Sequence, residues 1–486
     1  MTDEKLGRAA ARGIAWSFLG TVASRLVTLL GLAVLARLLA PADFGLLALA
    51  LVYITYVETV SDLGIGMALV YWPSRTADAA QVAFVLNVAL AAVWLALTTI
   101  LASPVAAFFG NPQGESVLRA LAWSFPIKAL GATHEALCQK GMRFRARVAP
   151  EVGQAAVKAL VSIVLAKAGF GVWSLVYGQL LGLMAGALLL WAVVPWRPRW
   201  HWPAGLLGPM LRYGRGIVAV NLLAAVTHHA DLVVVGRMLG AAALGFYQMA
   251  GKVPEATITV LVWVTSRVLF PAFSRMRAEG HAVGEAYLAA IRYVSLLSVP
   301  AALGLAALAE PLVLTVFGEK WRPAAPVLRA LAVYAGVRSL STPAGDVLKA
   351  LGRPGLLAAL GAGRAVVLVP ALVASARFGA PAVAAALASV TALALFVSTS
   401  WACRLAQVTG AKVVAAVRTS FLAGATLGLV LLAWNRWSAG LAAGPRLAGG
   451  VFVGLVAYAL AVRLLSPGLY AEARRTLLGP SFAEGR

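Results

Sequence analysis

Long apolar stretches recur at short intervals along this chain of 486 residues, and they limit its fold more than any other feature. A helix that crosses the hydrocarbon core of a membrane needs about 20 mostly apolar residues. Stretches of that kind lie near residues 13–38, 44–71, 79–102, 116–138, 149–167, 171–194, 214–238, 243–273, 286–309, 324–348, 355–376, 380–402, 414–434 and 446–465. Composition agrees, because 61% of the residues are hydrophobic and only 12% are charged. The pattern excludes a water-soluble enzyme and predicts an all-α, polytopic membrane protein with about 14 transmembrane helices.

The distribution of charge gives an orientation. The net charge is +23, which would indicate nucleic acid in a soluble protein, but cytoplasmic loops of membrane proteins also retain Lys and Arg. The cations gather in alternate connections, including residues 139–147, so we expect both termini in the cytoplasm and no nucleic-acid partner. The stretch 139–147 either docks on anionic headgroups or is a solvated topology signal. Cys138 and Cys403 lie far apart, and no disulfide framework is expected.

Residues 36–50 and 236–250 align with each other without gaps. The identical pairs are Arg37 and Arg237, Leu39 and Leu239, Ala42 and Ala242, Gly45 and Gly245, and Ala50 and Ala250. Chance similarity between Ala-rich and Leu-rich segments is the alternative to a duplication. A duplication predicts two six-helix bundles around a central cavity, as in some transporters, plus a terminal helix pair. The expected parts are lobes at 1–200 and 201–410, helices 13 and 14 within 411–465, and a cytoplasmic tail at 466–486.

Segments that resemble nucleotide or metal sites are incomplete. Residues 245–252 resemble a phosphate loop, but the spacing of the glycines is wrong and Val253 stands where Ser or Thr is needed. His134 begins a zinc-like pattern that Cys138 interrupts, so a buried polar residue is the better interpretation. Residues 228–231 (HHAD) suit a proton relay or buried hydrogen bonds better than chelation. We therefore expect a protein that binds no cofactor or metal ion and is not an enzyme.

Charges at membrane depth are the main functional signal. Each costs about 2.5–3.5 kcal/mol on insertion scales, so it usually faces a wet cavity or a partner. The mid-depth cations, counted from the predicted helix ends, are Arg25, Lys128, Lys158, Arg338 and Arg364. Their excess predicts an anionic cargo that carries phosphate, whose oxygens Arg binds in a two-pronged geometry. We assign Arg25, Arg338, Arg364 and Lys128 to a substrate-binding cationic cavity; the alternative is that some of them, first Lys158 and Lys128, snorkel to an interface.

Few acidic residues lie at the same depth. Glu58, Asp62 and Asp231 are candidates for ion or proton coupling. Glu58 and Arg25 lie at matching depths on consecutive helices, so an ion pair between them is as consistent with the sequence as a free arginine.

Gly178, Gly182 and Gly186 form a ladder of small residues that permits close contact between helices. We expect this ladder to serve internal packing rather than dimerisation.

Four segments resemble a known family. GIAWSFLGTVASRLVTLLGLAVLARLLAPADFGLLALA at 13–50, SDLGIGMALV at 61–70, QKGMRFRAR at 139–147 and the stretch 229–276 are similar to bacterial polysaccharide-repeat flippases. These are the O-antigen and exopolysaccharide exporters, or lipopolysaccharide biosynthesis proteins, of the multidrug/oligosaccharidyl-lipid/polysaccharide exporter superfamily. The resemblance extends over roughly residues 10–280.

The resemblance implies two six-helix lobes around a central cationic cavity in the bacterial inner membrane. It implies that alternating access moves an undecaprenyl-diphosphate-linked oligosaccharide from the inner to the outer leaflet, with the bilayer and polysaccharide polymerase or export machinery as further partners. Cavity arginines are a feature of the related lipid II flippases, and Arg25 and Arg364 are the residues expected to fill that role.

Two other functions compete with this one. A cation-coupled multidrug exporter of the same superfamily would need an acidic cavity, but Arg25 stands in the first helix where an acid is expected. A membrane glycan polymerase or ligase would need a large periplasmic loop with catalytic polar residues. The longest predicted outer loop, near residues 104–115, is short.

Overall fold

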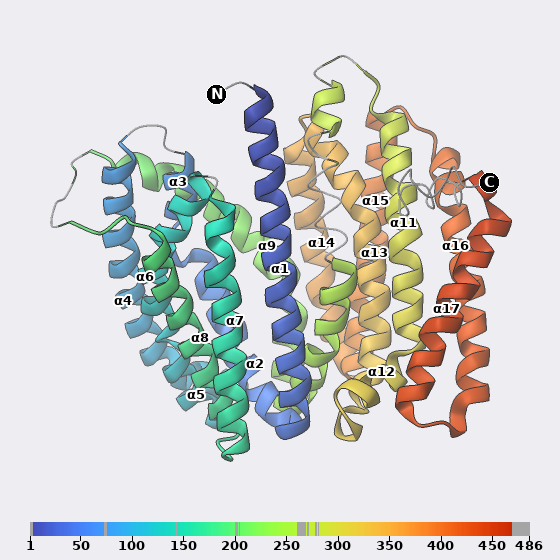
Figure 1. The fold of residues 1–486 in the computed structure, drawn as a ribbon, viewed down its shortest axis with the longest axis horizontal. Coiled ribbons are helices and arrows are strands. Elements are labelled where there is room, and N and C mark those ends of the chain that lie inside the picture. Colours follow the sequence, from blue (N-terminus) through green and yellow to red (C-terminus); the bar gives the residue numbers. More distant parts are fainter. Residues whose placement is uncertain are drawn as a thin grey trace. The chain divides into compact units, whose positions relative to one another are not determined.

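The fold is known from a computed structural model, which describes residues 3–71, 75–141, 143–199, 203, 205–259, 269, 272–277, 279 and 281–468. Every regular element in these ranges is a helix (Figure 1). The elements are α1 (Asp3–Leu38), α2 (Pro41–Ser61), α3 (Ile65–Tyr71), α4 (Thr76–Phe108), α5 (Gln113–Leu121), α6 (Ser124–Lys140), α7 (Phe144–Lys167), α8 (Val172–Val193), α9 (Leu207–Pro254), the π-turn η1 (Glu255–Thr259), α11 (Gly284–Ala307), α12 (Ala309–Val316), the 3-10 turn η2 (Glu319–Trp321), α13 (Ala324–Ala350), α14 (Pro354–Ala376), α15 (Ala380–Leu405), α16 (Gly410–Trp437), η3 (Ser438–Gly440) and α17 (Ala443–Leu465). The predicted all-α class is confirmed.

The outward surfaces of the helices are apolar. Ten helical stretches among the described residues are long and apolar enough to cross a membrane. Val366 of α14 is 73% exposed and Phe452 of α17 is 69% exposed. Backbone groups in hydrocarbon must be satisfied within the helix, so apolar side chains on the outside and closed hydrogen bonding inside suit a lipid solvent. The chain is a multi-pass membrane protein.

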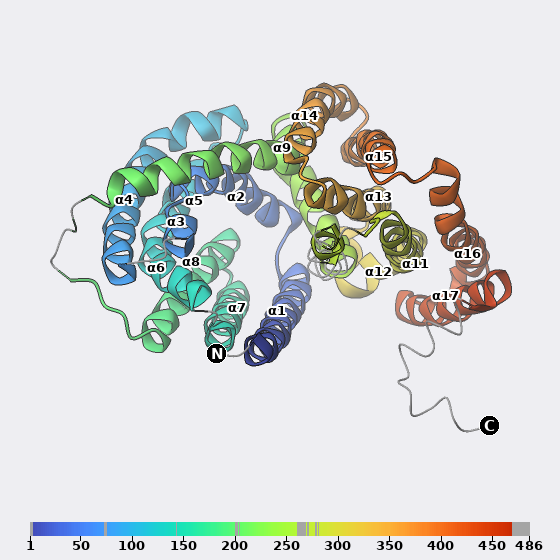
Figure 2. The ribbon, with the colours of Figure 1, turned by 90° about the horizontal axis from the view of Figure 1, so that it is seen from above.

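The chain divides into two compact units, residues 1–245 and 246–486. In the first unit α1 packs on α7, and α7 packs on α8 (Figure 2). Its main core joins α2, α5, α6 and α8 through residues such as Ile54, Leu118, Phe125 and Val176. The lobe boundary expected near residue 200 stays a prediction.

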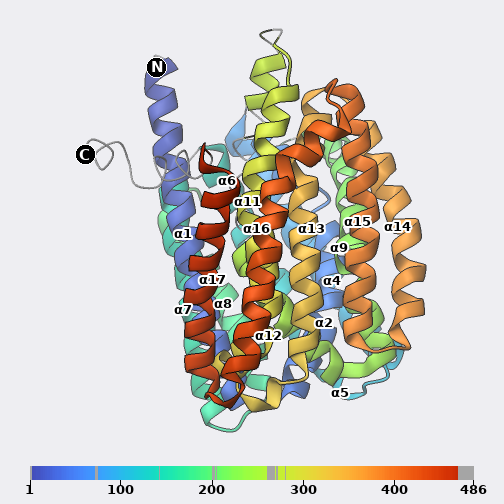
Figure 3. The same cartoon turned by 90° about the vertical axis from the view of Figure 1, so that its right-hand side faces the viewer.

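In the second unit α13 packs against both α11 and α15, and α14 packs on α15. The core at one end of this unit includes Tyr287, Ile291, Val347 and Ala402. Helices α16 and α17 form an antiparallel pair (Figure 3), and α16 packs on α11. The hydroxyl of Tyr458 on α17 donates a 2.7 Å hydrogen bond to the carbonyl of Leu296 on α11. The terminal helix pair is thus attached to the body of this unit.

Two of the predicted spans are interrupted in the structure. The spans 44–71 and 116–138 are each divided, into α2 and α3 and into α5 and α6. At the first break Leu63 and Gly64 both have left-handed φ angles, of 48° and 72°. The carboxylate of Asp62 accepts a 2.9 Å hydrogen bond from the Gly64 N–H there. The predicted helices at 214–238 and 243–273 both fall in α9, which consists of two helices that meet at a kink at Gly240, a residue with a non-helical backbone conformation; most of 260–273 lies outside the described residues.

Residues of the two aligned segments that belong to the first unit contact each other closely. A Cβ at Gly45 would overlap the carbonyl oxygen of Ala241, and a Cβ at Gly245 would overlap the carbonyl oxygen of Pro41. The contact is reciprocal, because Pro41 and Ala241 are themselves aligned in the repeat. Both crossings need glycine, since the backbones touch where a side chain would start. A duplication accounts for such a symmetric contact.

The glycine ladder of α8 faces α7. A Cβ at Gly182 would lie 2.8 Å from Cβ of Lys158 and 2.9 Å from the carbonyl oxygen of Gln154. Gly178 and Gly186 likewise contact Ser162 and Gln154. The prediction that the ladder serves internal packing is confirmed.

Candidate functional site: the charges within the membrane spans

One ion pair lies inside the first unit, between α2 and α6. Nζ of Lys128 lies 2.5 Å from Oε1 of Glu58. The Lys128 side chain is 40% exposed and that of Glu58 is 27% exposed, so neither charge is completely buried. Lys128 thus has an acidic partner, and its proposed role in substrate binding stays a prediction. The sequence offered Arg25 as the ion-pair partner of Glu58, whereas the structure places Lys128 against this carboxylate.

The other cations of the first unit occupy separate helices. Arg25 is half-buried on α1, and Lys158 is half-buried on α7, where its backbone carbonyl and Cβ contact the glycine ladder. The proposed role of Arg25 in a cavity stays a prediction.

The second unit holds two arginines near the middle of its helices. Arg338 has fourteen residues of α13 before it and twelve after it, and Arg364 has ten residues of α14 before it and twelve after it. Ten residues of helix rise by about 15 Å, so each arginine lies well inside its helix. Both side chains are half-buried. Within the described ranges, neither forms an ion pair with a carboxylate.

The surroundings of Arg364 are only partly matched to its charge. Its Nη2 donates a 3.1 Å hydrogen bond to the hydroxyl oxygen of Thr391 on α15. That hydroxyl in turn donates to the carbonyl of Leu387 at 2.6 Å. Nε of Arg364 is buried and has no hydrogen-bond partner in the described part of the chain. A guanidinium has five N–H donors, so several stay available for an anion.

A further arginine was missed by the sequence analysis. Arg292 lies eight residues into α11, is half-buried, and has no side-chain partner among the residues that the structure describes. The prediction of the span at 286–309 placed it close to the interface. The signal that could have found it is the start of the helix at Gly284, which moves Arg292 deeper.

The three acidic candidates have different surroundings. Glu58 is paired with Lys128, and Asp62 caps the break between α2 and α3. Asp231 on α9 is 8% exposed, and the neighbouring His229 makes an edge contact with the ring of Tyr56 on α2 at 6.3 Å. Coupling roles for all three stay predictions.

No group of three or more His, Cys, Asp or Glu side chains is arranged to hold a metal ion in the described ranges. His134 is buried beside aromatic rings instead. Its ring centroid lies 4.7 Å from that of Trp191, and its Nε2 lies 3.2 Å from the carbonyl oxygen of Trp196. This agrees with the interpretation of His134 as a buried polar residue.

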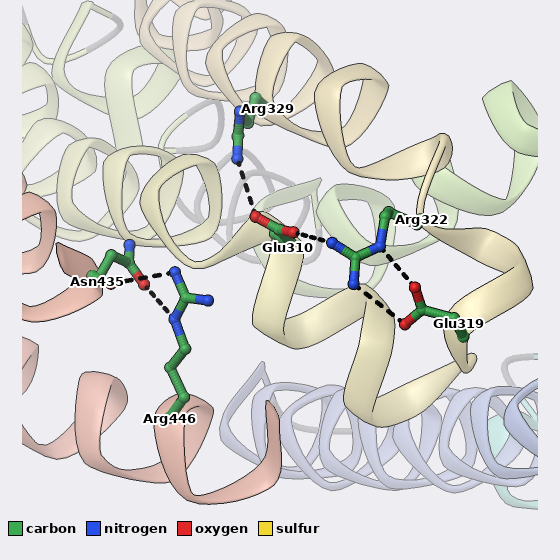
Figure 4. Close-up of polar contacts among 6 residues, drawn as sticks. All are labelled: Glu310, Glu319, Arg322, Arg329, Asn435 and Arg446. Atoms are coloured by element: carbon green, nitrogen blue, oxygen red, sulfur yellow. Dashed lines mark hydrogen bonds and ion pairs between the residues drawn. The ribbon is translucent and has the colours of Figure 1, made fainter. Parts of the chain in front are cut away.

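Cations in the α12–α13 connection differ from the mid-span arginines because they are neutralised locally (Figure 4). Arg322 contacts both carboxylate oxygens of Glu319, at 2.7 and 3.2 Å, and reaches Glu310 at 2.7 Å. These hydrogen bonds from Arg322 hold the pKa of the Glu319 carboxyl below its usual value. On the neighbouring hairpin Arg446 donates to Asn435. This network fixes the loops and neutralises the charge of Arg322.

Comparisons with known proteins agree with this architecture. Two curated relatives are each 27% identical: the succinoglycan biosynthesis transport protein ExoT of Rhizobium meliloti (strain 1021), with 74% of this chain and 72% of the relative aligned, and the lipopolysaccharide biosynthesis protein WzxC of Escherichia coli (strain K12), with 74% of each aligned. The teichuronic acid biosynthesis protein TuaB of Bacillus subtilis (strain 168) is 26% identical over 71% of this chain and 72% of its own length.

Solved structures show the same fold. The lipid II flippase MurJ in an inward closed conformation superimposes with a TM-score of 0.74 over 94% of this chain and 99% of its own, at 12% identity. An inward-facing multidrug resistance transporter of the MATE family gives a TM-score of 0.60 over 80% of this chain and 94% of its own, at 16% identity. Residues 34–326 match the polysaccharide biosynthesis protein family. Because that match includes more than half of the sequence, the chain belongs to the polysaccharide biosynthesis protein family.

Proposed function

We propose that this protein is a flippase for a polyprenyl-diphosphate-linked oligosaccharide, the repeat unit of a bacterial polysaccharide. It moves the headgroup from the inner to the outer leaflet of the bacterial inner membrane by alternating access, with both termini in the cytoplasm. Dragging sugar and phosphate through hydrocarbon without a polar path is prohibitive, because each unsatisfied polar group costs several kcal/mol. A protein that holds the headgroup and opens to alternate sides removes most of that cost.

The observation that carries the proposal is the pair of mid-span arginines in the second unit, Arg338 and Arg364. A lone charge at this depth costs about 2.5–3.5 kcal/mol on insertion scales. No carboxylate neutralises either guanidinium among the described residues, and Nε of Arg364 is buried without an acceptor. A diphosphate supplies the missing negative charge and the missing acceptors, and the planar guanidinium binds two phosphate oxygens at once.

The relatives support the same cargo. Their names assign them to the biosynthesis or transport of succinoglycan, lipopolysaccharide and teichuronic acid. In our proposal Arg25 and Lys128 join Arg338 and Arg364 in binding, and Glu58, Asp62 or Asp231 couple transport to an ion gradient. Polymerase and export proteins act on the delivered repeat unit afterwards.

The test uses cells in which this protein is the sole flippase for its repeat unit. Arg338→Ala and Arg364→Ala should each reduce outer-leaflet exposure of the lipid-linked oligosaccharide about tenfold or more, since a charge-assisted hydrogen bond to phosphate contributes about 1.5–3 kcal/mol. Arg364→Lys should recover only part of the activity, because Lys cannot form the two-pronged contact. Exposure is measured with an added glycosidase that cannot cross the membrane.

The matched control is Arg377→Ala, which removes an exposed arginine from the end of the same helix α14. It should transport normally. Normal outer-leaflet exposure in the Arg338→Ala/Arg364→Ala double variant, at normal protein level, would overturn the proposal.

A multidrug exporter is the second candidate by fold alone. A chamber for organic cations should be lined by carboxylates, but the mid-span charges of α13 and α14 are arginines. Resistance of the same cells to cationic dyes should therefore not depend on this protein.

A further inference from the structure

The ion pair between Glu58 and Lys128 connects two helices that are far apart in sequence, α2 and α6 of the first unit (Figure 1). Two opposite charges in a membrane span compensate each other's insertion cost, so a completely buried ion pair would need no further explanation. The Glu58–Lys128 pair is not completely buried. Both side chains are partly exposed.

The hydrogen bonds of the pair are incomplete as well. An ammonium group has three donors, and the described structure shows one hydrogen bond from Nζ of Lys128, to Oε1 of Glu58. No contact to Oε2 of Glu58 is present among the described residues. Lys128 therefore has donors left for a second anion.

A second anion at Lys128 would also meet Glu58. The carboxylate oxygen lies 2.5 Å from Nζ, so any phosphate oxygen that contacts Nζ comes within a few ångströms of a negative charge. Like charges brought together in this way cost several kcal/mol, unless one of them moves away or is protonated. A phosphate group and the Glu58 carboxylate therefore compete for the ammonium group of Lys128.

We propose that Glu58 is a built-in competitor of the cargo at Lys128. The carboxylate occupies the lysine in the substrate-free protein, is displaced when a diphosphate binds, and returns when the diphosphate leaves. This inference rests on the proposed function and gives Glu58 a role other than ion coupling. It also explains why a tight cation site does not trap its cargo, because transport needs binding that is weak enough for release.

A neighbouring feature allows the displacement. Glu58 lies one turn before the end of α2, where the chain breaks at Asp62–Gly64. A helix end next to a break tolerates rearrangement more easily than the middle of a continuous helix, because fewer backbone hydrogen bonds hold it.

The experiment measures the affinity of the purified full-length protein, in nanodiscs of zwitterionic lipid, for undecaprenyl diphosphate. Inorganic pyrophosphate, which has no lipid tail, is the second probe. Glu58→Gln should bind both probes about tenfold more tightly, because the competing charge is gone. The same variant should flip the lipid-linked oligosaccharide more slowly in cells, since release becomes limiting.

Lys128→Gln should weaken binding, and adding Glu58→Gln to it should then change affinity little. This non-additivity identifies a shared partner. The double variant also contains no unpaired charge, so it keeps the test valid if a single variant folds poorly. The matched control is Glu135→Gln on the same helix α6, whose carboxylate pairs with Arg147. It should leave affinity unchanged.

The outcomes separate this inference from the proposed function. Absence of diphosphate binding by the unmodified protein would overturn both. Binding that Lys128→Gln weakens but Glu58→Gln does not strengthen would overturn the competitor role alone. Slower transport by Glu58→Gln with unchanged affinity would assign Glu58 to ion coupling instead and also overturn the competitor role.

Discussion

Individual side chains determine how far each positive charge is neutralised, in the helices and in the connections between them. Arg322 in the α12–α13 connection is paired with two carboxylates, and Lys128 is paired with one. Among the residues that the structure describes, Arg364 has only the hydroxyl of Thr391 as a side-chain acceptor. The number of carboxylate partners therefore falls from Arg322 to Lys128 to Arg364. Arg322 fixes a loop, whereas Arg364 keeps N–H donors that could bind an anion.

The hydroxyl of Thr391 offers a test at this scale. Thr391→Val keeps the shape of the side chain but removes the acceptor for Arg364, and loss of one hydrogen bond to a charged group costs about 1.5–3 kcal/mol. We expect a lower midpoint of thermal unfolding, measured by tryptophan fluorescence in detergent. Undecaprenyl diphosphate should restore part of the loss, because phosphate oxygens replace the hydroxyl.

Thr391→Ser is the control for that substitution, since it keeps the oxygen, and its midpoint should stay near that of the unmodified protein. Equal midpoints for the Val and Ser variants would show that the hydrogen bond contributes nothing to stability.

At the scale of helices, close packing of α7 on α8 depends on the absence of side chains along one face. Gly178→Val should destabilise the first unit, because even a Cβ there would lie 2.9 Å from the carbonyl oxygen of Lys158. Overpacking of this kind costs about 1–3 kcal/mol. The midpoint of thermal unfolding measures it. Gly428→Val on α16, where no atom lies within 4 Å of the added Cβ, should have a much smaller effect; equal losses would contradict the packing role of the ladder.

Hydropathy predicted the helices well, because the need to satisfy backbone groups in lipid acts locally on each stretch. It missed the breaks at Asp62–Gly64 and between α5 and α6, since short interruptions hardly change the hydropathy of a window of about 20 residues. The partner of Glu58 could not be predicted either. Lys128 is 70 residues away in sequence, and only tertiary packing decides which of several cations at one depth meets the carboxylate.

For the molecule as a whole, the segments that are similar in sequence are also in contact in the fold. The aligned segments 36–50 and 236–250 were proposed as copies from their sequences, and Gly45 and Gly245 contact each other's segment reciprocally. A contact that uses aligned residues from both copies is under a double constraint, because a change on either side disturbs the same crossing.

That constraint predicts non-additive mutations. Gly45→Ala forces α2 away from the carbonyl of Ala241, and Gly245→Ala forces the same two segments apart at the carbonyl of Pro41. Each variant should lower the midpoint of thermal unfolding and speed amide hydrogen exchange in both segments. The double variant should be little worse than either single one, since the crossing opens once.

Gly251→Ala, whose added Cβ would meet only a side-chain atom at an ordinary 3.7 Å, should change neither quantity. Fully additive losses would mean that the two glycines act at separate contacts.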